Sequence, residues 1–131
     1  MFKNFYNWFK IKTKINNGDN ILIAKEREII MCHLGLNVGF EQDGSGDSFL
    51  RPVLIFKKFS NKLYIIIPLT KKHRTGKFYF TFSFNKKTQS TAILSQLKII
   101  DSKRFIYKMG YISKEDFDKI KDSVFDLLYS K

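Results

Sequence analysis

Two apolar runs of strand length lie at the centre of the chain, on either side of a short polar segment. Residues 51–56 begin with Arg51 and continue as an apolar run, and residues 63–70 lead through consecutive isoleucines to Thr70. The segment between them is rich in lysine and other polar residues, as turns are. This pattern predicts an antiparallel hairpin, whose outer ends lie side by side. Arg51 and Thr70 should therefore face each other.

The residues at the open end of this hairpin suit a phosphate group. An arginine beside a hydroxyl, followed by Lys71, Lys72 and His73, makes a reasonable phosphate site. An ordinary hairpin with a surface arginine explains the same spacing, and chance matches to such a motif are frequent. The hairpin pattern alone leaves both interpretations open.

Further strands are indicated before and after the hairpin. Residues 27–34 have the pattern of one strand. Residues 78–84 alternate phenylalanine with polar or hydroxyl side chains, which predicts a half-buried strand followed by a turn at residues 85–89. The phenylalanines could form a base-stacking platform, but at strict alternation a place in the core is favoured.

The second half of the chain adds two more strands. Residues 91–100 are mostly apolar and predict one strand interrupted by Ser95 and Gln96, and residues 105–112 contain a further short strand after a turn. Between the first strand and Arg51 lies a glycine-rich loop, residues 35–47. Loops of this length are usually functional or mobile. We expect this one to form a wall of the site, although it lacks the spacing of a nucleotide-binding P-loop.

A helix is predicted at each end of the chain. Ser113 is a good N-cap for the last one, with Glu115 and Asp116 favourably placed in its first turn. Its apolar face consists of Phe117, Ile120, Val124 and either Leu127 or Leu128.

The N-terminal helix is basic and aromatic over residues 1–15. Its apolar stripe recurs at helical spacing as Phe2, Phe5, Tyr6 and Phe9, widened by Trp8, Ile11 and Ile15. We expect this helix to dock on the domain and cover apolar surface. An anchor on a membrane surface and a segment that contacts RNA are the alternatives.

These elements together predict an α+β fold that is mainly β. We expect a small, strongly bent antiparallel sheet, or SH3-like open barrel, with a C-terminal helix and an extra N-terminal helix. The chain has 131 residues, enough for one domain with a sizeable core. We divide it into an N-terminal extension, residues 1–25, and a domain, residues 26–131.

The charge of the chain narrows its possible partners. Lysine and arginine number 24 against 12 acidic residues, giving a net charge of +12. Such a charge favours a polyanionic partner, which could be nucleic acid, an acidic protein or an anionic membrane surface. A lysine-rich genome would produce part of the same excess.

The few cysteines and histidines argue against a metal or a cofactor. Cys32 is the single cysteine, so no internal disulfide or cysteine cluster can form, which fits a reducing cytoplasm. Its place in a predicted strand favours a buried, inert thiol. His33 and His73 have no zinc-site spacing. No apolar run approaches the length of a membrane span.

Four segments resemble the MazF/PemK family of toxin endoribonucleases. One is Arg27-Glu28-Ile29 with Leu34, and a second is Val38-Gly39-Phe40-Glu41-Gln42 followed by Arg51-Pro52-Val53-Leu54-Ile55. The others are Ile67-Pro68-Leu69-Thr70 and the segment 93–104, after which Gly110-Tyr111-Ile112-Ser113 leads into the last helix. The resemblance covers most of the chain, from about Glu26 to Leu128.

The resemblance implies a cytoplasmic ribonuclease that cuts single-stranded RNA at specific sequences without a metal or other cofactor. It implies a homodimer neutralised by a cognate antitoxin. Arg51 and Thr70 match the family's catalytic arginine and threonine. Glu41 and Gln42 match a loop that shapes the substrate groove, and Gln96 matches a glutamine near the site.

The chemistry of such a cleavage fits these residues. The 2′-hydroxyl of RNA attacks phosphorus, so the site must stabilise negative charge and supply a proton to the leaving oxygen. Arg51 suits the first task, and Thr70 can hydrogen-bond the phosphate or the 2′-hydroxyl. Lys71 and Lys72 are expected to bind substrate, and His73 is a candidate helper because imidazole titrates near neutrality.

The chain also departs from the family pattern. The loop before Arg51 is longer and carries Asp43 and Asp47, Lys71 replaces a hydroxyl residue, and Ser95 replaces an acid. Residues 1–25 have no counterpart in compact members. Two other functions remain open on the same fold: a non-catalytic module that binds nucleic acid or regulates a partner, and a toxin directed at DNA gyrase.

Overall fold

The computed structural model describes residues 2–85 and 88–130. Met1, Lys86, Lys87 and Lys131 lie outside the described residues, and so do the parts of the predicted N-terminal helix, the turn at 85–89 and the domain that fall on them. The helices are α1 (Phe5–Asn17) and α2 (Lys114–Tyr129), with short 3-10 helices η1 (Leu94–Gln96) and η2 (Ser102–Arg104). The strands are β1 (Glu28–His33), β2 (Leu50–Lys58), β3 (Leu63–Thr70), β4 (Tyr79–Phe82), β5 (Ser90–Ile93), β6 (Lys98–Asp101) and β7 (Phe105–Tyr111).

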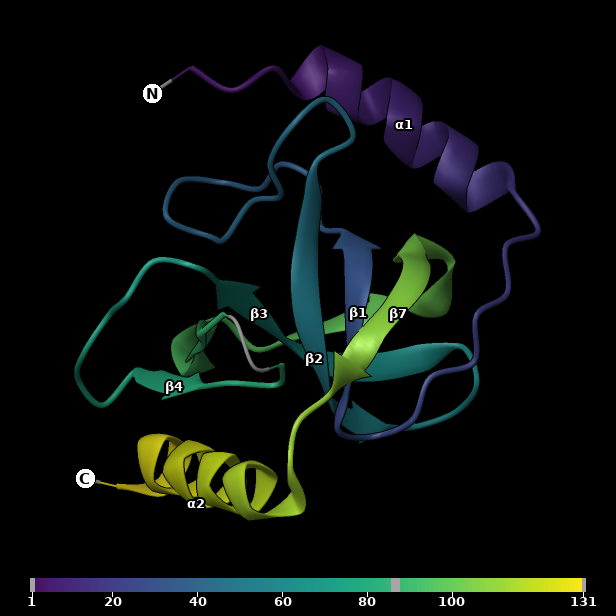
Figure 1. The fold of residues 1–131 in the computed structure, drawn as a ribbon. Helices are drawn as coiled ribbons and strands as arrows, with labels where there is room; N and C mark the ends of the chain where they lie inside the picture. The colour runs from purple at the N-terminus through teal and green to yellow at the C-terminus, as the bar shows by residue number, and fades with distance from the viewer. Residues whose placement is uncertain (1, 86–87, 131) are drawn as a thin grey trace.

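The strands form one open antiparallel sheet with the order β4-β5-β3-β2-β1-β7, and β6 also pairs with β3. The sheet bends strongly, and α1 and α2 lie at opposite ends of it (Figure 1). The predicted fold class is therefore confirmed: mainly β, with one helix at each end of the chain. In the described part of the chain, neither helix is long and apolar enough to cross a membrane.

The central hairpin has the predicted strands and register. β2 and β3 are antiparallel, and Val53 lies opposite Pro68 and Leu54 opposite Ile67. Extending this register by two residues places Arg51 opposite Thr70, at the end of the hairpin away from its turn. β2 is longer than the predicted run, because it begins at Leu50 and continues to Lys58. Its pairing with β3 also has a register shift between Ile55 and Lys57.

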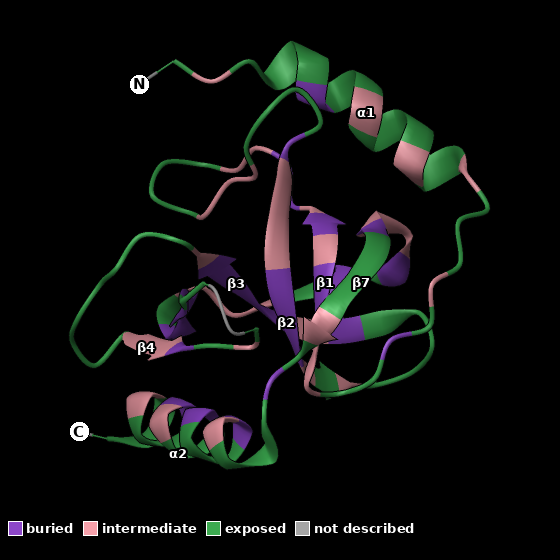
Figure 2. Ribbon diagram, in the orientation of Figure 1, coloured by how far each residue is buried: buried purple, intermediate pink, exposed green. Residues whose placement is uncertain are grey.

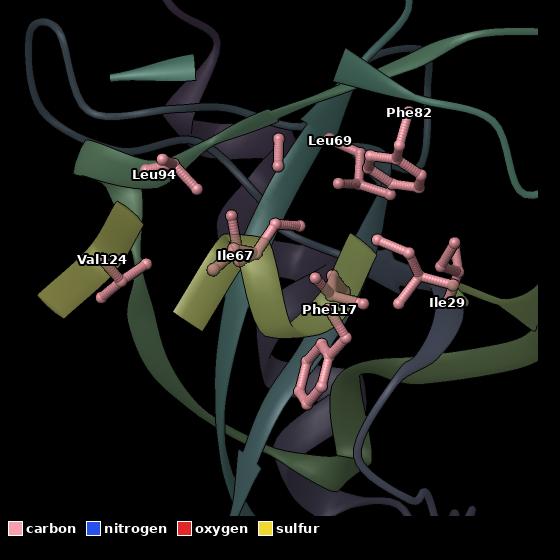
Figure 3. Packing of buried hydrophobic residues seen from close by; sticks show 11 residues of the cluster. Ile29, Ile67, Leu69, Phe82, Leu94, Phe117 and Val124 are labelled. Carbon is pink, nitrogen blue, oxygen red and sulfur yellow. The ribbon is translucent and has the colours of Figure 1, made fainter. Parts of the chain in front are cut away.

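Both faces of the bent sheet are buried, which explains why its central strands are apolar at successive positions. Neighbouring residues along a strand point to opposite faces. One face packs against α2 (Figure 3), and its buried residues are Ile29, Leu54, Ile67, Leu69, Phe82, Ala92, Leu94, Ile112, Phe117, Ile120 and Val124. The other face buries Ala24, Ile30, Cys32, Leu34, Val53, Ile55, Tyr64, Ile66, Ile100 and Phe105.

The predicted single strand over residues 91–100 is wrong, because the chain forms two strands there. β5 pairs with the Thr70 end of β3, through Leu69 and Thr70, whereas β6 pairs with the opposite end, from Leu63 to Ile66. The 3-10 turn η1 moves the chain from one pairing to the other. The step occurs at Ser95 and Gln96, and it places Gln96 beside the loop that precedes β2 rather than in the sheet.

Helix α1 docks on the domain through Trp8 and not through the four aromatic residues that define its predicted apolar stripe. Trp8 is its only buried residue, and Ile11 and Ile15 are half-buried (Figure 2). The four residues of the predicted stripe, Phe2, Phe5, Tyr6 and Phe9, are all exposed. The expectation that the helix docks is therefore correct, but the docked face consists of Trp8, Ile11 and Ile15.

Candidate functional site

A cavity of about 820 Å³ opens at the end of the hairpin away from its turn, and both Arg51 and Thr70 line it. The strands bring side chains from distant parts of the sequence to its walls. They are Met31, Ser45, Leu50, Arg51, Pro52, Leu69, Thr70, Lys71, Lys72, Phe84, Asn85, Thr88, Ser90 and Met109. Four of the eight residues predicted for the site, Arg51, Thr70, Lys71 and Lys72, thus share one cavity.

The guanidinium of Arg51 is held in place by two main-chain oxygens. Its Nε donates to the carbonyl of Asp43 at 2.6 Å, and one terminal nitrogen donates to the carbonyl of Leu69 at 3.0 Å. The other terminal nitrogen has no hydrogen bond to any of the described residues. Arg51 therefore reaches the cavity in a fixed orientation with donor capacity left for a ligand.

The surroundings of Arg51 strengthen its effect on an anion. Burial lowers the pKa of the guanidinium, and the nearby carboxylate of Asp43 opposes that shift. An arginine stays charged under all conditions in which proteins fold. Because the charge is half-buried, water screens it less than it would screen a fully exposed arginine, so it attracts a bound phosphate more strongly.

Thr70 presents a hydroxyl at the end of β3. Its Oγ1 accepts a hydrogen bond from the main-chain N–H of Lys72 at 3.2 Å. That bond uses an acceptor position and leaves the hydroxyl proton free to be donated. Thr70 can therefore donate to an anion in the cavity while the turn after β3 holds its oxygen.

Three other predicted residues line a neighbouring cavity of about 380 Å³, namely Glu41, Gln42 and Gln96. The side chain of Gln96 accepts from the main-chain N–H of Gln42 at 3.2 Å and donates to the carbonyl of Phe40 at 3.1 Å. Gln42 in turn donates from its side chain to the carbonyl of Asp43 at 3.2 Å. Since Arg51 donates to the same carbonyl, hydrogen bonds link the two cavities.

His73 is the predicted site residue that the structure does not bring to the others. It is exposed in the segment after β3 and lines neither of the two cavities. Adjacency in sequence to Thr70 favoured it, but the chain leaves the sheet directly after Thr70. A part for His73 in proton transfer would require this segment to move.

Lys98 is a site residue that the sequence did not suggest. It lines the smaller cavity, and its ammonium donates to the side chain of Asn37 at 3.2 Å. Burial lowers its pKa, Arg104 adds to that shift, and Glu41 opposes it. The signal available in the sequence was a single charged residue between Leu97 and two isoleucines.

The thiol and the acidic groups do not form a reactive centre of their own. Cys32 is buried in β1, and burial raises the pKa of its thiol to about 12. The thiolate that would act as a nucleophile is therefore scarce near neutrality. Among residues 2–85 and 88–130, no three histidine, cysteine, aspartate or glutamate side chains gather as a metal site would require.

Comparison with known proteins gives a family match and several structural matches. Residues 25–128 match the family described as "PemK-like, MazF-like toxin of type II toxin-antitoxin system". No curated protein matches the chain.

Solved structures share the fold at low sequence identity. MazF from Deinococcus radiodurans superposes with a TM-score of 0.64 at 14% identity, covering 82% of this chain and 97% of that one. A mycobacterial endoribonuclease, solved in complex with its cognate antitoxin, gives 0.62 at 12% identity, with 82% and 97% covered. The Mycobacterium tuberculosis toxin MazF-mt6 gives 0.61 at 14%, with 78% and 96% covered.

Proposed function

The chain belongs to the family of PemK-like, MazF-like toxins of type II toxin–antitoxin systems, and from this membership we propose that it is an endoribonuclease. It cuts single-stranded RNA at specific sequences, needs no metal ion, and is neutralised by a cognate antitoxin. A structural neighbour is an endoribonuclease solved with its cognate antitoxin, which supports RNA cleavage and neutralisation by an antitoxin. Because the substrate is RNA, the toxin acts in the cytoplasm.

The observation that carries the proposal is the arrangement of Arg51 and Thr70. Arg51 is fixed by two carbonyl groups, and Thr70 presents its hydroxyl in the same cavity. Within residues 2–85 and 88–130, one terminal nitrogen of Arg51 and the hydroxyl proton of Thr70 have no hydrogen-bond partner. Lys71 and Lys72 add positive charge to the cavity wall. Donors that are oriented before a ligand binds are what the stabilisation of a phosphoryl transition state requires.

The proposed reaction is an internal transfer at phosphorus. The 2′-oxygen forms a bond to phosphorus and loses its proton, while the bond to the 5′-oxygen breaks and that oxygen gains a proton. The products are a 2′,3′-cyclic phosphate and a 5′-hydroxyl. Arg51 stabilises the charge that develops on the phosphoryl oxygens, and Thr70 donates a hydrogen bond that orients the phosphate. His73 is a candidate for moving the protons, provided that its segment closes over the substrate.

The smaller cavity offers a place for the RNA on one side of the cleaved bond. Glu41, Gln42 and Gln96 supply both donors and acceptors there, and Lys98 supplies a positive charge. Such a mixture can distinguish bases by their edges. We assign substrate binding to these residues together with Lys71 and Lys72, and catalysis to Arg51 and Thr70.

The test is to incubate the purified protein with long single-stranded RNA in excess EDTA. We expect discrete fragments with cyclic-phosphate ends from the parent protein and none from Arg51→Ala. The matched control is Arg74→Ala, which removes the same charge from an exposed position after β3 and should still cut. Cleavage by Arg51→Ala at the parent rate would refute the assigned site.

If the parent protein leaves the RNA intact, the ribonuclease function is refuted, and one of two other functions is favoured. A nucleic-acid-binding module would lose affinity gradually as lysines are removed, and its binding would weaken steeply with salt. A gyrase-directed toxin would inhibit supercoiling of plasmid DNA by purified gyrase without yielding RNA fragments.

Two further points of organisation are proposals. We propose that residues 1–25 are an extension of a toxin domain formed by residues 26–131, which the family match over residues 25–128 supports. We also propose that the protein is a homodimer, as the family resemblance implies. Light scattering coupled to size-exclusion chromatography would give the mass of the particle, and a mass near 15.5 kDa at micromolar concentration would contradict the dimer.

A further inference from the structure

The side chain of Lys3 is inserted into the loop that connects β1 to β2. Its ammonium donates to the carbonyl of Asn37 at 2.7 Å and to the carbonyl of Gly39 at 3.0 Å, and it lies 3.0 Å from a carboxylate oxygen of Asp43. An ammonium has three donors, and these partners use all of them. Only 11% of the Lys3 side chain is exposed. Lys3 is therefore a largely buried lysine with specific partners, unlike a surface lysine that happens to lie near an acid.

A second contact holds both ends of the same loop. The ring of Trp8 packs edge-on against Phe49 at 5.6 Å and lies so close to Gly35 that a Cβ atom there would come within 2.2 Å of it. Gly35 and Phe49 begin and end the loop, and the N–H of Gly35 donates to the carbonyl of Phe49 at 3.1 Å. The N-terminal segment and α1 thus contact the loop through Lys3 within it and through Trp8 at its two ends. Figure 1 shows this segment and helix running beside the loop.

Asp43 connects this contact to Arg51. Its carboxylate accepts from Lys3 and, at 2.6 Å, from the main-chain N–H of Asn37, while its own carbonyl accepts from Arg51 at 2.6 Å. The same residue is therefore bonded to the N-terminal segment through its side chain and to the proposed catalytic arginine through its main chain. A movement of Asp43 would change both.

We propose that residues 2–17 form an internal brace for the proposed catalytic site, and that Lys3 is a positioning residue for Arg51 that acts through Asp43. The inference rests on the proposed ribonuclease function for its kinetic consequence. The loop from Gly35 to Phe49 contains four glycines, each of which widens the range of conformations open to the main chain. Held at Lys3 and Trp8, the loop presents the Asp43 carbonyl in one place, and Arg51 keeps its orientation.

The brace makes a prediction that differs from that of a simple RNA-binding lysine. The charge of Lys3 is already paired with Asp43 and shielded from solvent, so its removal should alter turnover more than affinity for RNA. An exposed lysine of α1 that bound RNA would instead alter affinity and its dependence on salt. The two roles are separated by measuring kcat and KM individually.

The kinetic experiment compares Lys3→Met with Lys10→Met. Lys10 is an exposed lysine of α1 whose ammonium lies over the ring of Tyr6, so both variants lose one charge from the N-terminal region. We expect Lys3→Met to lower kcat by about ten-fold or more, because a displacement of about 1 Å can cost about 100-fold, with little change in KM. Lys10→Met should retain the parent kcat. Equal kcat values for the two variants would overturn the proposal.

A second variant pair tests the route through Asp43. If Lys3 acts by holding the Asp43 carboxylate, the loss of kcat on Lys3→Met should shrink when Asp43 is already changed to Asn, because the ion pair is then absent. Fully additive losses in the double variant would show independent effects and would overturn this route. Lys3→Gln keeps N–H donors for the carbonyls of Asn37 and Gly39. Its kcat should therefore lie between those of the parent and Lys3→Met.

The last measurement does not depend on RNA cleavage. The Nε–H of Arg51 donates to Asp43, and its exchange with solvent can be followed by nitrogen-15 NMR. We expect faster exchange in Lys3→Met than in the parent or in Lys10→Met, and an unchanged rate would overturn the brace. If the parent protein fails to cut RNA, the proposed function is refuted. The exchange rate of the Arg51 Nε–H would still show whether Lys3 holds Arg51 in place through Asp43. The fluorescence of Trp8, the only tryptophan, verifies in each variant that α1 remains docked.

Discussion

The Nε of Arg51 donates a 2.6 Å hydrogen bond to the main-chain carbonyl of Asp43. The hairpin supplies the arginine, and the loop before the hairpin sets its orientation. Two separate elements therefore determine the position of the charge at the proposed site. The geometry of that site depends on the loop as much as on the strands.

Replacement of Arg51 by lysine tests whether orientation matters beyond charge. A lysine keeps the positive charge, but a single ammonium cannot bond the Asp43 and Leu69 carbonyls and still present the planar fork that matches a phosphate. We expect Arg51→Lys to lower the single-turnover rate of RNA cleavage by at least about 100-fold. Arg74→Lys makes the same exchange at an exposed position and should cut normally. A rate for Arg51→Lys within a few-fold of the parent would mean that charge alone suffices.

Thr70 can be tested with two substitutions of similar size. Thr70→Val keeps the shape of the side chain and removes the hydroxyl, whereas Thr70→Ser keeps the hydroxyl. A hydrogen bond to a charged group contributes about 1.5–3 kcal/mol, so we expect Thr70→Val to cut RNA about 10- to 100-fold more slowly. Thr70→Ser should retain most of the activity. Equal rates for the valine and serine variants would remove the hydroxyl from the mechanism.

Gln96 is predicted to shape the RNA-binding surface and not the chemical step. Gln96→Leu removes the hydrogen bonds to Gln42 and Phe40 and frees the adjacent loop. We expect a higher KM and a broader set of cleaved sequences, measured by sequencing the fragments of a mixed RNA pool. Gln89→Leu changes an exposed glutamine and serves as the control. An unaltered cleavage pattern in Gln96→Leu would argue against substrate contact in the smaller cavity.

Cys32 should make the stability of the protein depend on alkaline pH. Its thiol pKa rises from 9.0 to about 12 on folding, because burial disfavours the thiolate. The folded protein therefore keeps a proton that the unfolded chain loses above pH 9. The resulting stabilisation is complete below pH 9 and is lost as the pH rises towards about 12, by up to about 1.4 kcal/mol per pH unit.

Urea unfolding at a series of pH values measures this loss. Cys32→Val has a side chain of similar size and no proton to release, so its free energy of unfolding should fall less steeply over the same interval. The difference between the two slopes isolates the thiol, because the two proteins share every other ionisable group. Parallel slopes would show that the thiol does not contribute.

The N-cap of α2 can be removed at Ser113 to lower stability without touching the proposed site. Its side-chain oxygen accepts from the main-chain N–H of Asp116 at 3.1 Å and caps α2, as its sequence position predicts. Ser113→Ala should lower the free energy of unfolding by about 1 kcal/mol. RNA cleavage should not change, because α2 lines neither cavity of the proposed site. Ser123→Ala, within the same helix, removes no cap and should not reproduce this loss.

Local sequence patterns predict most of the strands and the antiparallel pairing of the central hairpin. Strand periodicity and turn composition are local properties, and the register of a hairpin follows from its turn. The neighbourhood of Arg51 and Thr70 could therefore be predicted without coordinates. The same reasoning predicted the cap of α2, since the capping hydroxyl of Ser113 and the main-chain N–H of Asp116 that donates to it are only three residues apart.

Local pattern could not decide choices that depend on a distant partner. α1 has apolar side chains on more than one face, and Trp8 docks because Gly35 and Phe49 form a niche for it. The apolar run over residues 91–100 matches one strand or two equally well. The run forms two strands because β5 and β6 pair with different parts of the same edge of β3.

The contacts that orient Arg51 were decided by the tertiary structure alone. They are made to the carbonyls of Asp43 and Leu69, and since every residue has a carbonyl, no side-chain pattern distinguishes these two. The same holds for Lys3, one of many lysines in the sequence, whose ammonium is selected by the oxygens that the folded loop gathers around it. Residue types suggest which groups can act, but the path of the main chain decides which of them are held in place.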